Sequence, residues 1–174
     1  MAHIDINSGH TVRGKGGGAA YKGFTEADIV RSVEKALIPL LKAKGHKVTS
    51  STVDKATTQN SYLKAVCKKV NASGAELFIS LHCNASASHA GRGVECFTWR
   101  GRQHATAAKI CENLSALGFK NRGIKDGSGL YVIKHTNPTA ILVELFFLDN
   151  EQDRARWKQH GARGIAEAIA KAIG

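Results

Sequence analysis

The sequence predicts an α/β fold: a single domain with a central, mostly parallel, twisted sheet of about six strands, flanked by helices on both faces. Three observations support this prediction. Short apolar runs of strand length alternate along the chain with longer amphipathic patterns of helical period. The chain has 174 residues, enough for one domain with a sizeable core. No internal repeat or linker divides it, so we expect residues 1–174 to form one domain.

Six short segments are expected to be strands. Residues 3–7 alternate strictly between polar and apolar side chains, as in a strand with two different faces. The runs at 76–83 and 140–147 are more continuously apolar, which is typical of strands covered on both faces. The predicted strands are residues 2–7, 46–52, 76–83, 94–99, 130–133 and 140–147.

Four amphipathic segments are expected to be helices. The first begins near Thr25, whose hydroxyl can cap it, and ends near Gly45. Pro39 falls inside this pattern and is expected to kink or shorten the helix. The other helices are expected at about residues 63–74, 105–117 and 160–174.

The charge of the chain favours polyanionic partners. Lys and Arg number 25 against 14 acidic residues, which gives a net charge of +11. An anionic cell wall and a nucleic acid both fit this balance. Nucleic acid is disfavoured because aromatic residues make up 6% of the chain and no zinc-finger spacing, RNA-recognition octapeptide or helix-turn-helix pattern is present.

The sequence also bears on location and on the cysteines. No run approaches the roughly 20 apolar residues that span a bilayer. The first residues carry no basic segment followed by an apolar one, so we expect synthesis in the cytoplasm without a signal peptide. We also expect a monomeric protein.

None of the four cysteines forms a CxxC pair. Cys67 and Cys111 are expected to be small buried hydrophobes, and disulfides stay open.

Four polar residues are predicted to meet at one edge of the sheet. In open α/β sheets, sites lie beyond the carboxyl ends of the strands. His10 follows the first strand, His82 ends the third, and Glu144 lies near the end of the last. Glu26 opens the helix after the first strand, on the same side. Two histidines and two glutamates are therefore expected to converge.

This set has a coherent chemistry. Catalytic zinc typically takes three protein ligands and keeps one position for water, and two histidines with one glutamate supply the three. A second glutamate that does not bind the metal can act as general base toward that water. Three of these residues also have a purely structural interpretation. Glu26 would complement a helix dipole, His10 would be a solvated loop residue, and Glu144 would belong to a buried salt bridge.

Five short segments carry a family resemblance. They are Ser8-Gly9-His10, Gly23-Phe24-Thr25-Glu26, Ile79-Ser80-Leu81-His82-Cys83-Asn84-Ala85, Gly93-Val94-Glu95-Cys96-Phe97 and Pro138-Thr139-Ala140-Ile141-Leu142-Val143-Glu144. In this order they resemble the N-acetylmuramoyl-L-alanine amidases of the Amidase_3 type, and the chain looks most like the catalytic domains of phage endolysins. The likeness covers nearly the whole chain.

The resemblance implies a function. It implies a hydrolase with one Zn²⁺ per chain that cuts the amide between N-acetylmuramic acid and L-alanine in peptidoglycan. It assigns the metal to His10, Glu26 and His82, and the general base to Glu144. We expect a catalytic domain without a separate wall-binding domain in this chain, acting on the cell wall after release, as lysins do, or after secretion by another route.

Three residues are expected near the substrate. The glycine-rich loop at 14–18 is expected to border the site, where Arg13 and Lys15 would contact acidic peptide stems. Asn84 would either bind substrate or simply end its strand. The loop formally matches a dinucleotide-binding pattern, but it lies too far from both strand and helix. No Gly-x-Ser-x-Gly elbow is present, and a Cys83 nucleophile would leave both glutamates unexplained.

Two other functions stay open from the residues alone. A zinc peptidase that cuts within the peptide stem would use an identical ligand set. A non-catalytic module that binds wall polymer or nucleic acid would use the basic charge alone, and its function would not depend on Glu144.

Overall fold

A six-stranded sheet forms the centre of the molecule in the computed structural model, which describes residues 1–14 and 16–174. The strand order is β5-β1-β7-β10-β8-β9. The first four strands are mutually parallel, β8 is antiparallel to β10, and β9 is parallel to β8. The bounds are β1 (His3–Ser8), β5 (Lys47–Ser50), β7 (Leu77–Asn84), β8 (Val94–Thr98), β9 (Asn121–Asp126) and β10 (Thr139–Phe147). The predicted mostly parallel sheet is confirmed.

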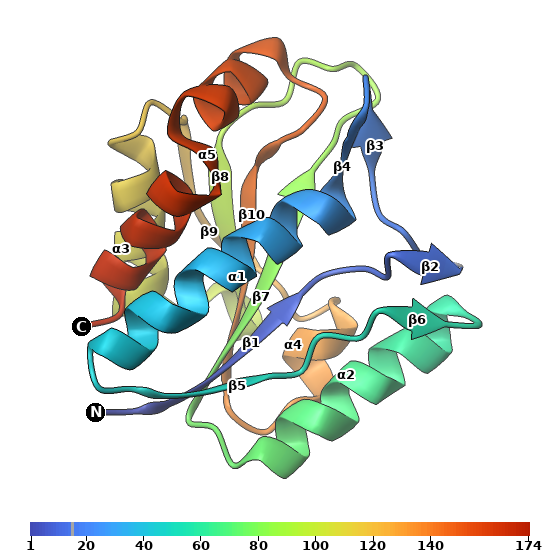
Figure 1. Ribbon diagram of the computed structural model, residues 1–174, viewed down its shortest axis with the longest axis vertical. Coiled ribbons are helices and arrows are strands. Elements are labelled where there is room, and N and C mark those ends of the chain that lie inside the picture. The colour runs from blue at the N-terminus through green and yellow to red at the C-terminus, as the bar shows by residue number, and fades with distance from the viewer. Residues whose placement is uncertain (15) are drawn as a thin grey trace.

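Helices cover both faces of this sheet (Figure 1). The larger apolar cluster joins the sheet to α1 (Glu26–Ala43), α3 (Ala105–Ser115) and α5 (Glu151–Ala172). The smaller cluster joins the other face to α2 (Gln59–Ser73) and α4 (Tyr131–His135). The short elements are β2 (Arg13–Gly14), β3 (Ala20–Tyr21), β4 (Phe24–Thr25), β6 (Lys55–Ala56) and η1 (Trp99–Gly101).

Side chains of the central strands alternate between the two faces, and this alternation decides where the polar residues point. On β7, Ile79 packs in the larger cluster and Phe78 in the smaller one. On β10, Leu142 packs in the smaller cluster. By the strand period of two, His82 and Glu144 lie on the face that also carries α2 and α4.

The first helix begins as predicted and continues through its proline. The Thr25 hydroxyl accepts a hydrogen bond from the backbone N–H of Asp28, which satisfies one free donor of the first turn. Pro39 lies inside α1, and the helix extends beyond it to Ala43. Gly45 then adopts a φ of +86°, a conformation that favours glycine. Pro39 therefore does not end the helix.

The predicted strand at 130–133 is wrong. Residues Tyr131–His135 form the short helix α4, whose Val132 and Ile133 are buried against the sheet. A short apolar run has no periodicity that separates a strand from a buried helical turn. The sixth strand is instead β9, at Asn121–Asp126, which is mostly polar because it is an edge strand.

The last helix is longer than predicted. It begins at Glu151, where Asn150 accepts hydrogen bonds from the backbone N–H groups of Gln152 and Asp153. At Gly161 the backbone turns to φ 61° and ψ −174°, and the helix then continues to Ala172. The buried residues of α5 before this break are the polar Asp153 and Arg154, so the apolar period of four is visible in the sequence only after it.

The four cysteines are buried and form no disulfide. Cys67 of α2 and Cys111 of α3 belong to the two apolar clusters, as expected for small hydrophobic residues. Across the part of the chain that the structure describes, no helix has the length and apolar character needed to span a membrane.

Candidate active site

His10, Glu26 and His82 form a compact cluster at the carboxyl ends of β1 and β7. Nε2 of His10 lies 3.2 Å from Oε2 of Glu26, and Nδ1 of His82 lies 3.0 Å from Oε1 of the same carboxylate. One ligand atom from each residue lies within 4.8 Å of the other two. This arrangement can hold a metal ion, because imidazole nitrogen and carboxylate oxygen are ligands that zinc accepts.

Hydrogen bonds with the backbone orient the side chains of this cluster. Nδ1 of His10 lies 2.9 Å from the carbonyl oxygen of Gly16, so Nδ1 carries the proton and donates it, and Nε2 is the nitrogen that could bind a metal ion. Glu26 accepts hydrogen bonds from the backbone N–H groups of Ala19 and Cys83, both at 2.9 Å. The carboxylate is therefore held by β7 and by the segment that precedes β3, besides its own helix.

The protonation of the cluster depends on burial and on charge. Burial alone would lower the pKa of His10, but the hydrogen bond and the charge of Glu26 outweigh burial and raise it. Burial alone would raise the pKa of Glu26, but hydrogen bonds and charge from His10 and His82 hold it far below its usual range. Glu26 is thus an ionised carboxylate, the form that binds a metal.

Two glycines make room for the histidine rings. A Cβ atom on Gly9 would lie 2.3 Å from Cε1 of His82. A Cβ atom on Gly18 would lie 2.6 Å from Oε2 of Glu26 and 2.8 Å from the His10 ring. All three distances are far below van der Waals contact, so a side chain at either position would prevent the cluster from forming.

Glu144 lies beside this cluster. It is the register partner of His82 on the neighbouring strand. Its Oε2 atom is buried and has no hydrogen-bond partner among the described residues. Burial, together with the negative charges of Glu26 and Glu95, raises the pKa of Glu144 well above its ordinary value. A buried, unpaired carboxylate next to potential metal ligands is typical of a functional group rather than a structural one.

A second carboxylate lies opposite Glu144 on the next strand of the sheet, and the sequence did not predict it as part of the site. Glu95 of β8 is the register partner of Glu144 and is 5% exposed. It accepts hydrogen bonds from Nε of Arg122 at 2.7 Å and from Nδ2 of Asn84 at 2.9 Å. Its segment Gly93-Val94-Glu95 belongs to the family resemblance, but no pattern in the sequence indicates the pairing with Arg122.

The three predicted substrate contacts have different outcomes. Asn84 lies at the end of β7, where its amide group binds Glu95 and its oxygen accepts from the N–H of Ala85. Arg13 lies in β2, which pairs with β6. Lys15 lies outside the described residues. A role for these residues in substrate binding stays a prediction.

Cys83 does not share the site. It packs in the larger apolar cluster, on the opposite face from the one on which His82 lies, and is 3% exposed. Burial and the charges of Glu26 and Glu144 raise the pKa of its thiol well above the ordinary value. This supports the rejection of a cysteine nucleophile.

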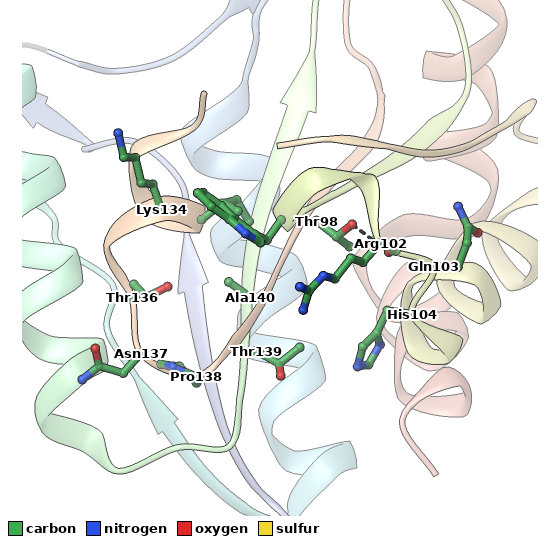
Figure 2. Close-up of a pocket in the computed structure, with 12 residues that line it drawn as sticks. Thr98, Arg102, Gln103, His104, Lys134, Thr136, Asn137, Pro138, Thr139 and Ala140 are labelled. Carbon is green, nitrogen blue, oxygen red and sulfur yellow. Dashed lines mark hydrogen bonds between the residues drawn. The ribbon is translucent and has the colours of Figure 1, made fainter. Parts of the chain in front are cut away.

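The candidate site is distinct from a concavity of about 470 Å³ at the other end of β10 (Figure 2). That concavity lies between the β8–α3 connection and the α4–β10 connection, and its lining includes Trp99, Arg102, Lys134 and Ala140. Ala140 precedes Glu144 by four residues, or about 13 Å along a strand. None of His10, Glu26, His82 and Glu144 is among the residues that line it.

Comparison of the sequence with known proteins finds one family and several relatives that match nearly the whole chain. The profile of the Amidase_3 family, described as N-acetylmuramoyl-L-alanine amidase, matches residues 4–174. The endolysin of Bacillus phage SPP1 is 30% identical over 182 residues, which cover 97% of this chain and 65% of that protein. An uncharacterised protein of Clostridium perfringens is 32% identical over 175 residues, covering 98% of this chain and 51% of that protein. The chain thus spans about half to two thirds of the length of these relatives.

Solved structures give the same result. The catalytic domain of the CD27L endolysin, which targets Clostridia difficile, has a TM-score of 0.88 and 32% identity, covering 99% of this chain and 97% of the other. The catalytic domain of CwlV, an amidase from Bacillus (Paenibacillus) polymyxa, has a TM-score of 0.83 and 27% identity, covering 99% and 96%. With its fold, its cluster of His10, Glu26 and His82, and a profile match from residue 4 to residue 174, the chain belongs to the N-acetylmuramoyl-L-alanine amidase family.

Proposed function

We propose that residues 1–174 form the catalytic domain of a zinc-dependent enzyme that hydrolyses the amide between N-acetylmuramic acid and L-alanine in peptidoglycan. Membership of the amidase family supports the class of reaction, and the similar relatives include a phage endolysin and an amidase catalytic domain. The observation that carries the proposal is the position of Glu144, a buried carboxylate in register with a histidine of the candidate metal cluster.

The ligands proposed for one zinc ion are Nε2 of His10, the carboxylate of Glu26 and a ring nitrogen of His82. The donor set fits zinc, since the three groups already converge and the proton of His10 is held on Nδ1. A bound zinc ion would polarise the scissile carbonyl and lower the pKa of a water molecule toward about 7.

Glu144 is the proposed general base. It takes a proton from the attacking water and then gives it to the nitrogen of the leaving L-alanine. Two features suit this role. Oε2 of Glu144 has no hydrogen-bond partner among the described residues, which leaves it available to the water and the amine. Burial also raises the pKa of Glu144, which makes the group a stronger base.

Anionic cell-wall polymers are the proposed second partner. The net charge of +11 would hold the enzyme on a wall rich in carboxylates and phosphates. We propose that the domain acts there as a monomer, after release from the cell as a lysin or after secretion by another route.

Mass spectrometry of fragments released from purified peptidoglycan tests this function. Digestion is run as purified, with a chelator, and with zinc added back. Free peptides that begin with L-alanine, lost on chelation and restored by zinc, are the expected result. Cuts inside the stem would move the assignment to a zinc peptidase. No release despite bound zinc would exclude these substrates, and no release without zinc binding would favour a basic wall-binding module.

A further inference from the structure

Four polar side chains form a row across four neighbouring strands. His82, Glu144 and Glu95 are successive register partners on β7, β10 and β8. The register between β8 and β9 shifts at this level, and the shift places Arg122 of β9 opposite Glu95. The row therefore begins at the candidate metal cluster and ends at an arginine on the edge strand.

A β-bulge orients Arg122. Two residues of β9, Arg122 and Gly123, lie opposite the single residue Glu95, and Gly123 has a φ of +73°. A glycine in this conformation is characteristic of a bulge that bends a strand and redirects a side chain. The Arg122 guanidinium is held on one edge by Glu95, to which Nε donates at 2.7 Å, and it lies 5.0 Å from the centre of the Phe147 ring.

The terminal nitrogens of Arg122 are free to bind another group. Neither has a hydrogen-bond partner within residues 1–14 and 16–174, and the side chain is 33% exposed. A guanidinium fixed through Nε presents these two nitrogens as a fork that matches a carboxylate. Glu95 does not fill this fork, because its other oxygen is bound by Asn84.

The proposed function, on which this inference rests, indicates how the substrate would lie along this row. The scissile carbonyl would lie at His10, Glu26 and His82, and Glu144 would give its proton to the leaving nitrogen. The leaving peptide therefore begins on the β10 side and continues toward β8 and β9. Two strand spacings separate the Cα atoms of Glu144 and Arg122 by about 10 Å. Two extended residues span about 7 Å, and the arginine side chain covers the rest.

We propose that Arg122 binds the α-carboxylate of the second residue of the peptide stem. This residue is an acidic amino acid linked through its side chain, and its α-carboxyl group is free in some walls and amidated in others. The carboxylate offers two charged acceptor oxygens to the free fork of Arg122, whereas the amide carries no charge and offers one acceptor oxygen in place of two. The enzyme is thus selective for stems with a free α-carboxyl group.

Two soluble substrates that differ in one group test this proposal. They are muramyl tripeptides with either an α-carboxylate or an α-carboxamide on the second residue. The zinc-loaded enzyme is expected to have a kcat/KM at least 10-fold higher on the carboxylate, the usual range for a charge-assisted hydrogen bond. Arg122→Gln is expected to abolish this preference by slowing the carboxylate substrate alone. Arg122→Lys keeps the charge that neutralises Glu95 but lacks the fork, so it is expected to retain part of the preference.

Controls separate this role from the alternatives. Arg163→Gln removes one positive charge from an exposed pair with Glu167 and is expected to leave the preference unchanged. Equal loss of activity on both substrates in Arg122→Gln would assign Arg122 a structural role and overturn the proposal. So would a wild-type enzyme that cleaves both substrates equally. Cleavage of neither substrate by the zinc-loaded wild type would instead contradict the proposed amidase function itself.

Discussion

Glu144 of β10 is the register partner of His82 of β7, so a buried carboxylate lies one strand spacing from the candidate metal cluster. Its Oε2 has no partner among the described residues, and such a group normally destabilises a fold. The strand pairing that places it there also holds the sheet together. The position of this proposed general base is therefore fixed by the core and not by a loop.

Glu144→Gln is expected to lower the turnover of peptidoglycan by about 10²- to 10⁴-fold, because the amide cannot take up a proton from water. Zinc content is expected to stay near one ion per chain, since Glu144 is not a proposed ligand. The free energy of unfolding should not fall, because the change removes a buried carboxylate that lacks a partner. Assays of turnover, metal content and denaturant unfolding check these outcomes, with the exposed Glu112→Gln as control. Undiminished turnover would remove Glu144 from the mechanism.

Gly9→Ala is expected to abolish tight zinc binding. The added Cβ would lie 2.3 Å from the His82 ring and would push this ligand away from His10 and Glu26. Gly129→Ala is a matched control, because a Cβ there meets nothing within 4 Å. Titration with zinc, followed by calorimetry, compares the two variants. Equal zinc affinity in both would show that His82 does not need its present position.

The site was predictable from the sequence because it follows a general rule of α/β sheets. His10 and His82 come directly after strands with clear apolar patterns, so their common edge could be inferred. Glu26 could be added because a helix that follows the first strand starts at the same edge. The order of strands and helix starts was enough to expect these three residues at one edge, and the family resemblance supplied their assignment as metal ligands.

The part of the row that Glu95 and Arg122 form was not predictable from the sequence. β9 is an exposed edge strand whose polar sequence carries no strand pattern, so Arg122 had no assigned place. The apolar run at 130–133 predicts a strand instead, because four residues cannot distinguish the strand period from the helical period. The pairing of Arg122 with Glu95 also depends on a bulge, which shifts the register in a way that no local pattern specifies.

Asp153→Asn is expected to stabilise the protein more at pH 7 than at pH 4. One oxygen of Asp153 accepts from the N–H groups of Gly93 and Phe147, and an amide oxygen can keep both bonds. Burial outweighs these bonds and raises the pKa of Asp153 above its usual value. The stability that protonated Asp153 contributes is fully present below its unfolded pKa and is lost as the pH rises through its folded pKa. Urea unfolding of both proteins at the two pH values measures this difference, and a difference independent of pH would contradict it.

Arg31 is expected to position His10 without touching the metal. The backbone of His10 has a φ of +64°, a conformation that costs energy for a residue other than glycine. Arg31 holds it there by donating to the carbonyl oxygen of His10 at 2.9 Å and to that of Val53 at 3.3 Å. Arg31→Lys cannot span these acceptors, so we expect a 10- to 100-fold weaker affinity for zinc, the usual cost of losing a residue that supports a ligand. Asp54→Asn removes just the exposed partner of Arg31 and is expected to change the affinity little. If both variants bind zinc as the wild type does, the conformation of His10 is set by the β1–β2 connection alone.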